Sequence, residues 1–90
     1  MSAGKPNDLQ RDVDMFYSQH VNAVPALDDL TAITAVLPDD LEFLRRLLER
    51  CHREARKEYH NGHHLNGRRL WVLGEQLRRQ LDALADKSQH

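Results

Sequence analysis

Apolar residues recur at steps of three and four along most of this chain, which is the spacing of one face of an α-helix. The most regular run follows Pro38 and consists of Leu41, Leu44, Leu48, Cys51 and Ala55. Asp39, with Glu42 three residues later, predicts a capping-box start for this helix. Asn61-Gly62 predicts its end, because a left-handed residue is easily formed there.

Three further helices are predicted around this one. The first follows a cap at Asn7 or Asp8, and Pro25 either ends it or starts the next helix. Its apolar face is Leu9, Val13, Phe16, Tyr17, His20 and Val24. A short second helix spans residues 26–37; its TAITAV segment also suits a strand, but no second strand candidate exists to pair with it. The last helix runs from about residue 66 to 86 and carries a stripe of Leu70, Leu73, Leu77, Leu81 and Leu84.

These elements predict an all-α fold. The last two helices are long, leucine-rich and joined by a short turn, which is typical of an antiparallel helical hairpin. We expect the first two helices to cover its open face and complete a small four-helix bundle. The expected organisation is a disordered lead at 1–6, one helical domain at 7–87 and a disordered tail at 88–90. Because so small a core is marginally stable, we also expect a homodimer.

Charge is divided unevenly along the chain. Residues 1–42 hold two basic and eight acidic residues, a balance of −6, whereas residues 43–90 hold eleven basic and six acidic residues, a balance of +5. Such polarity concerns partners rather than fold. A helical wheel places four basic residues opposite the apolar stripe of the third helix, and we call them the basic stripe: Arg46, Arg50, Arg53 and Lys57.

The basic stripe is predicted to be fully exposed, where it can bind phosphates or an acidic protein surface. One alternative is an ordinary solvated face with ion pairs within the helix, such as Glu42 with Arg46 and Glu49 with Arg53. Another is that the acidic N-terminal half docks on the stripe, within the fold or across a dimer.

A second candidate surface surrounds Trp71 on the last helix. The wheel places Val72 away from the leucine stripe, alongside Arg68 and Arg79, and Trp71 near Arg78. Tryptophan and arginine are the residue types most enriched among interface hot spots, so this group predicts a protein-binding face. The alternative is that Trp71 packs beneath the first helix, as large aromatic residues in small domains usually do.

Histidines gather near the predicted turn, at His60, His63 and His64. Imidazoles at this density can bind zinc, but the spacing matches no zinc motif, so we expect neither a metal nor another cofactor. Cys51 falls on the apolar stripe and is expected to act as a small hydrophobic residue. A single cysteine cannot form an internal disulfide and fits a reducing cytoplasm.

Residues 62–67, GHHLNG, resemble the H-x-L-K-G motif of histidine phosphotransfer domains, which are also helical bundles. The resemblance implies that His63 carries a phosphoryl group. A further glycine follows in the family, as Gly74 does here, but one residue later than the family has it. The sequence departs from the family in three other ways. Asn66 stands in place of the lysine, two arginines follow the glycine where the family has small residues, and His63 lies in a predicted turn rather than within a helix.

No other enzyme signature is present, since the chain lacks a glycine-rich phosphate loop, an H-E-x-x-H motif and a nucleophile elbow. It also lacks an apolar run of about 20 residues, as a membrane span needs, and an apolar signal-like N-terminus. We therefore predict a cytoplasmic, non-enzymatic regulator or adaptor that binds another protein through a basic, tryptophan-containing face. The alternatives are nucleic-acid binding by the arginine-rich third helix and, third, phosphotransfer.

Overall fold

The computed structural model describes residues 6–22 and 30–88, and throughout these ranges the chain is helical or forms short connections. The elements in order are α1 (Pro6–Phe16), the π-helical turn η1 (Tyr17–Val21), α2 (Leu30–Ala35), α3 (Leu41–His60) and α4 (His64–Ser88). No strand occurs within the described ranges. The all-α class is confirmed, and the TAITAV segment is helical from Thr31 to Ala35.

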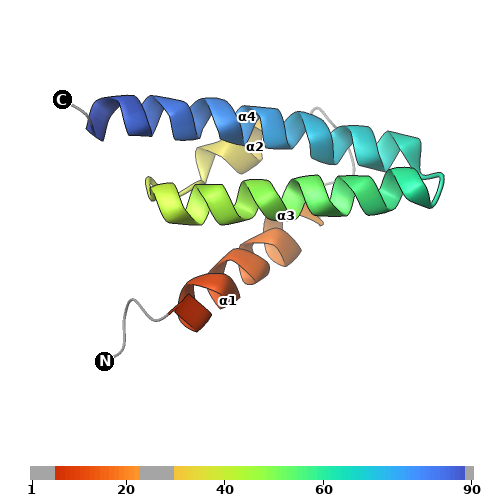
Figure 1. The fold of residues 1–90 in the computed structure, drawn as a ribbon, viewed down its shortest axis with the longest axis horizontal. Coiled ribbons are helices and arrows are strands. Elements are labelled where there is room, and N and C mark those ends of the chain that lie inside the picture. The colour runs from red at the N-terminus through yellow and green to blue at the C-terminus, as the bar shows by residue number, and fades with distance from the viewer. Residues whose placement is uncertain (1–5, 23–29, 89–90) are drawn as a thin grey trace.

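The centre of the fold is the predicted antiparallel hairpin of α3 and α4, which pack against each other along their length (Figure 1). Its turn is at Asn61-Gly62, as the sequence indicated. Gly62 has a φ of +84°, which only glycine adopts without strain, and the His63 amide donates to the Glu58 carbonyl at 2.7 Å. This closure satisfies a carbonyl that the end of α3 would otherwise leave unpaired.

The start of α3 differs from the sequence prediction by one residue. Asp40, not Asp39, is the cap, because its Oδ1 accepts from the amides of Glu42 and Phe43 at 3.0 and 3.2 Å. Asp40 has extended backbone angles, which aim its short side chain at the second and third amides of the helix.

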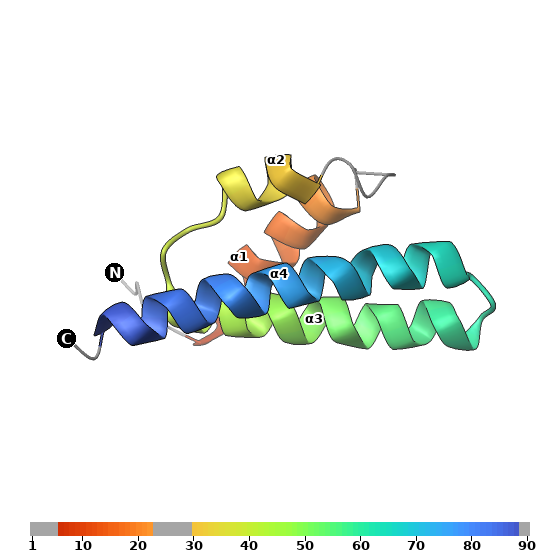
Figure 2. The same ribbon diagram turned by 90° about the horizontal axis from the view of Figure 1, so that it is seen from above.

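Helices α1 and α2 lie on the same side of the hairpin, with α1 crossing α3 and α2 lying against α4 (Figures 1 and 2). This confirms that the first two helices cover one open face. On the opposite side, no described helix lies over α3 and α4. Among the described residues, α1 and α2 thus cover one face of the hairpin, and no helix covers the other.

The core fills the space between the hairpin and the covering helices. Its buried residues are Val13, Tyr17, Val21, Ile33, Phe43, Leu44, Leu47, Cys51, Ala55, Leu70, Leu73 and Leu77. On α3, Phe43 and Leu47 are buried, whereas the predicted Leu41 and Leu48 are only half-buried. The reason is that α3 packs against both α1 and α4, so its buried arc extends towards α1.

Several predicted boundaries shift slightly. Pro6 begins α1, so Asn7 and Asp8 lie inside the helix rather than at its cap, and proline suits a first helical position. Ser88 ends α4 and so is not part of a disordered tail, and α4 begins at His64 rather than near residue 66. Val24, Pro25 and residues 26–29 lie outside the described ranges. No described helix is both long enough and apolar enough to cross a membrane.

Candidate functional site

The basic stripe on α3 is divided between two environments. Arg46 is half-buried, and its guanidinium donates to Glu42 and to Gln10 of α1, each at 3.1 Å. The predicted fully exposed row is therefore wrong for this residue. The helix turns this part of the stripe towards α1, because the buried arc of α3 includes Phe43 and Leu47 on that side.

Arg50 is bound even more completely within the fold. Its Nη1 donates to Asp14 at 2.6 Å, its Nε donates to Glu54 at 3.2 Å, and its guanidinium carbon lies 4.5 Å from the centre of the Tyr17 ring. The prediction of exposure is wrong here too. The alternative, docking of the acidic N-terminal half within the fold, describes the Asp14–Arg50 pair correctly.

The other half of the stripe remains at the surface. Lys57 is exposed and its Nζ lies 3.4 Å from Glu54. Arg53 is exposed and has no ion pair or hydrogen bond with any described residue. Two of the four predicted residues are thus available to a partner, and only Arg53 is unpaired within the described ranges.

Trp71 lies at the surface of α4 on the open side of the hairpin. Its side chain is 43% exposed and stacks on His52 of α3, with ring centres 4.4 Å apart and planes inclined by 25°. The alternative that Trp71 packs beneath the first helix is therefore wrong. Neighbouring Val72 is half-buried and packs against the core, so its expected position away from the apolar residues is also wrong. The contact of α2 with α4 explains this, because it widens the covered part of α4.

His52 occupies a notch that a glycine opens in α4. A Cβ atom at Gly74 would lie 2.6 Å from His52 Nε2, so only glycine leaves room for the ring in this position. Nε2 is buried and accepts or donates no hydrogen bond within the described ranges, and Glu75 Oε2 lies 3.8 Å away. Desolvation lowers the pKa of His52, and the Arg56 and Arg78 charges add to this, while Glu75 opposes it.

A second ring pair repeats this arrangement nearer the hairpin turn. Tyr59 of α3 lies over Gly67, where a Cβ would come within 3.0 Å of the tyrosine ring. His64 of α4 contacts Tyr59 with ring centres 5.8 Å apart. Tyr59 and His64 are both exposed. The two pairs are thus built alike: a ring from α3, a glycine beneath it and a ring from α4 beside it.

We call this side of the hairpin the uncovered face and define it by Glu49, His52, Arg56 and Tyr59 of α3 and His64, Trp71, Glu75 and Arg78 of α4. It lies away from α1, since His52 is roughly 160° around α3 from Arg50. Arg53 borders it, because a hollow of ≈ 360 Å³ is lined by Glu49, His52, Arg53 and Arg56.

Arginines without an ion pair in the described part of the chain surround the Trp71–His52 stack. Arg53, Arg56 and Arg78 are all exposed and belong to this group. Arg68 and Arg79 are exposed on α4 as predicted and are unpaired in the same sense. Of the predicted residues, Arg53 lines a hollow with His52, and Arg68 lies one turn from Trp71 on α4. Arg46 and Arg50 are instead paired within the fold, and Val72 packs against the core.

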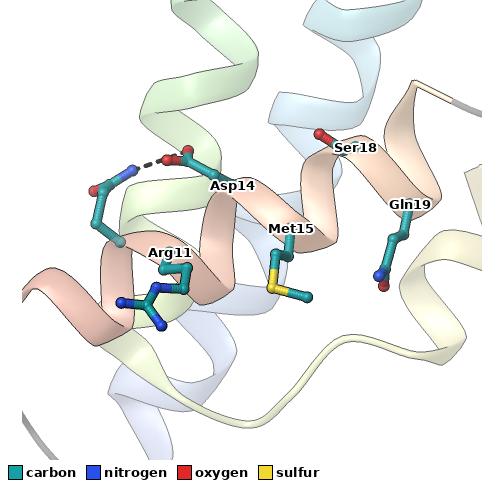
Figure 3. Close-up of a pocket in the computed structure, with 6 residues that line it drawn as sticks. Arg11, Asp14, Met15, Ser18 and Gln19 are labelled. Carbon is teal, nitrogen blue, oxygen red and sulfur yellow. Dashed lines mark hydrogen bonds between the residues drawn. The ribbon is translucent and has the colours of Figure 1, made fainter.

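A second hollow, of ≈ 490 Å³, lies along α1 and η1 (Figure 3). It is lined by Gln10, Arg11, Asp14, Met15, Ser18 and Gln19, and Gln10 donates to Asp14 across one end at 3.1 Å. The hollow is lined by side chains of one helical segment, and Asp14 is already paired with Arg50. We assign no chemistry to it.

The histidines near the turn do not converge. His63 Nδ1 lies 3.4 Å from Glu58, whereas His64 faces Tyr59. Within the described ranges, no three His, Cys, Asp or Glu side chains are grouped as a metal site requires. Cys51 is buried, and burial raises the pKa of its thiol to about 12, so it is an unreactive core residue, as predicted.

Sequence reasoning missed the roles of His52, Tyr59 and buried Arg69. A signal for the first two is present in the sequence, because His52 and Tyr59 are seven residues apart on one helix and Gly67 and Gly74 are seven apart on the next. Arg69 is only 5% exposed and donates through Nη1 to the Val21 carbonyl at 2.9 Å. Nothing in its sequence context distinguishes it from Arg68.

Comparison of the chain with known protein families, with curated proteins and with solved structures finds no match.

Proposed function

We propose that this chain is a non-enzymatic adaptor or regulator that binds another protein through the uncovered face, with Trp71 as its apolar anchor. The observation that carries the proposal is the Trp71–His52 stack, in which a tryptophan is 43% exposed and yet supported by a second ring. A large ring already held in place offers contact area and loses little side-chain freedom on binding. Tryptophans in this situation are frequent interface hot spots.

The arginines beside the stack support the same reading. Arg53, Arg56 and Arg78 are exposed, and each lacks an ion pair among the described residues. An unpaired guanidinium can form two parallel hydrogen bonds to a carboxylate, which adds orientation as well as affinity. The contact surface proposed here keeps Trp71 and the bordering Arg53 from the sequence prediction and adds Arg56, Tyr59 and Arg78. A cytoplasmic location and a homodimer remain parts of the proposal.

Nucleic-acid binding is the second candidate, because an exposed ring among arginines also suits stacking on a base. The basic stripe gives it less support than the sequence alone did. Arg46 and Arg50, which would have contacted phosphates, are paired with acidic residues of the fold. Phosphotransfer by His63 has less support still, since the residue stands in the turn beside Glu58 rather than within a helix.

The test is affinity capture from a lysate of the source organism, with and without nuclease. Wild type is compared with Trp71→Ala and with Arg53→Ala/Arg56→Ala, and Arg79→Ala is the control, because Arg79 lies about 100° around α4 from Arg78. We expect a protein that survives nuclease, is retained by the control and is lost with Trp71→Ala. Capture of nucleic acid alone would favour the second candidate. Capture that is equal for all four proteins would contradict the proposal.

A further inference from the structure

The two ring pairs of the uncovered face are related by a shift of one heptad. His52 and Tyr59 are seven residues apart on α3, and His64 and Trp71 are seven apart on α4. Seven residues rise about 10.5 Å along an α-helix, which is close to two turns. The uncovered face therefore presents two similar ring pairs at a helical repeat.

The glycines let these rings lie close to the backbone of α4. Gly74 lies beneath His52 and Gly67 beneath Tyr59, and a Cβ at either position would meet the ring at 2.6 or 3.0 Å. Without a side chain at these two positions, the rings of α3 can rest against the backbone of α4. The uncovered face thus presents ring surface at these two positions of the hairpin.

The exposed guanidinium groups on and beside the uncovered face outnumber its carboxylates. Arg53, Arg56 and Arg78 have no ion pair with described residues, and neither has Glu49, whereas Glu75 lies beside His52. Only Glu49 opposes Arg53 and Arg56 in the hollow that they line. A ligand that brings carboxylates would find guanidinium groups that no described residue occupies.

We infer that the partner segment is an acidic amphipathic helix, which lies on the uncovered face along the line where α3 and α4 meet. Two of its apolar side chains, seven residues apart, contact the two ring pairs, and its Asp or Glu side chains pair with Arg56 and Arg78. This inference rests on the proposed function and names the class of partner for the same face.

Helical spacing is what selects a helix over an extended segment. On a helix, residues seven apart return to the same face with a rise of about 10.5 Å, as the ring pairs do. On a strand, a separation near 10 Å corresponds to about three residues, whose side chains point to opposite faces. A third helix packed on two others is also the arrangement in which heptad-spaced apolar residues are buried together.

The test is selection from a displayed library of 18-residue helices that contain no tryptophan and are randomised on one face. The library is selected on the wild-type protein and counter-selected on Trp71→Ala. We expect enrichment of apolar residues at positions i and i+7 flanked by Asp or Glu. Selection of neutral or basic helices, of helices without the i and i+7 anchors, or of none that depend on Trp71 would overturn the inference.

One selected peptide is then titrated while the fluorescence of Trp71, the only tryptophan, is followed. We expect Arg56→Ala/Arg78→Ala to weaken binding at least ten-fold and Arg79→Ala to change it less than two-fold. Replacing the peptide's Glu residues with Gln should also weaken binding at least ten-fold. Equal binding by the Gln peptide would overturn the acidic class of partner.

Failure of this inference is distinguishable from failure of the proposed function. A captured protein that depends on Trp71 but binds through a basic or extended segment would keep the function and refute the partner class. Enriched acidic helices without any captured protein from the lysate would leave the inferred chemistry standing and remove the adaptor function.

Discussion

The surroundings of His52 favour the packing of its ring but disfavour its protonated, charged form. Its ring fills the notch over Gly74 and stacks on Trp71, while Nε2 is buried and has no hydrogen-bond partner in the described chain. Desolvation is the main reason why its pKa falls below 6.5, and the positive charges of Arg56 and Arg78 act in the same direction. The nearby Glu75 carboxylate only partly compensates.

The sign of the pH dependence follows from this lowered pKa. In the unfolded chain His52 binds its proton with an ordinary pKa, so below about pH 6.5 the unfolded state holds more protons than the folded state. The stabilising effect of neutral His52 is therefore complete above that pH and is lost as the pH falls towards the lower, folded-state pKa. We expect His52→Phe, which keeps a ring over Gly74, to reduce the loss of unfolding free energy on acidification.

Trp71 reports the same proton directly, because a protonated imidazole quenches an indole stacked on it. We expect the fluorescence of Trp71 to fall as the pH is lowered, with a midpoint below 6.5, and to change much less in His52→Phe. Gly74→Ala is the second check, since its Cβ would displace the His52 ring and weaken the quenching. A midpoint at or above 6.5, or the same curve in His52→Phe, would refute this account.

At the scale of elements, the end of η1 depends on one side chain from α4. Arg69 is buried, donates through Nη1 to the Val21 carbonyl, and donates through Nε and Nη2 to Asn66 Oδ1 at 3.0 and 2.8 Å. Asn66 in turn donates to Glu58, and this bond is the main cause of the lowered pKa of that carboxyl. Arg69 thus links α4 to η1 directly, and through Asn66 it is also connected to Glu58 of α3.

We expect Arg69→Ala to lower the free energy of unfolding by about 2–4 kcal/mol, because it removes the hydrogen bond that the described residues give to the Val21 carbonyl and removes a buried side chain. Denaturant unfolding measures the change. Arg68→Ala is the matched control, since Arg68 is exposed, and its effect should stay within about 0.5 kcal/mol. If the two substitutions had similar effects, the hydrogen bond from Arg69 to the Val21 carbonyl would not contribute to stability.

The N-terminal cap of α3 allows an equally direct comparison. Asp40 accepts hydrogen bonds from two amides at the helix start, and we expect Asp40→Ala to lower the unfolding free energy by about 1 kcal/mol. Asp39→Ala should have a smaller effect, because Asp39 makes no such bond with the described residues. The reverse order in thermal or denaturant unfolding would restore Asp39 as the cap.

The helices themselves were predictable because their apolar repeats are long and their ends carry turn residues. Leu44, Cys51, Leu70, Leu73 and Leu77 are buried as the three–four spacing indicated. The details failed where a helix touches two neighbours. Leu47 was missed and Val72 was misplaced, because a wheel for one helix contains no information on the positions of α1 and α2.

At the scale of the whole molecule, the candidate site was predictable only in part. Trp71 and its neighbouring arginines were found from residue type, because tryptophan and arginine are common at interfaces. His52 and Tyr59 were not found, since their importance depends on Gly74 and Gly67 across the hairpin. Arg46 and Arg50 were assigned to a partner, because the sequence does not reveal which acidic residues α1 brings against them.

The division of charge along the chain is therefore partly resolved inside the fold. The acidic half meets the basic half where Asp14 of α1 pairs with Arg50 of α3, and Arg46 reaches Gln10 of the same helix. Arg53, from the same stripe, keeps its charge for solvent or a partner. Within the basic stripe, Arg46 and Arg50 thus stabilise the fold, whereas Arg53 is accessible to a partner.

This division predicts opposite phenotypes for neighbouring arginines. We expect Arg50→Ala to lower the unfolding free energy by about 1–2 kcal/mol, because it removes the contact with the Tyr17 ring and the charged hydrogen bonds to Asp14 and Glu54. Asp14 is half-exposed, so solvent weakens its share of this effect. Arg53→Ala should change stability by less than about 0.5 kcal/mol but weaken capture of the partner. Parallel unfolding and capture measurements on the two variants test this. If Arg50→Ala lost partner binding without losing stability, Arg50 would belong to the interface. The whole basic stripe would then be a partner-binding surface, as the sequence alone predicted.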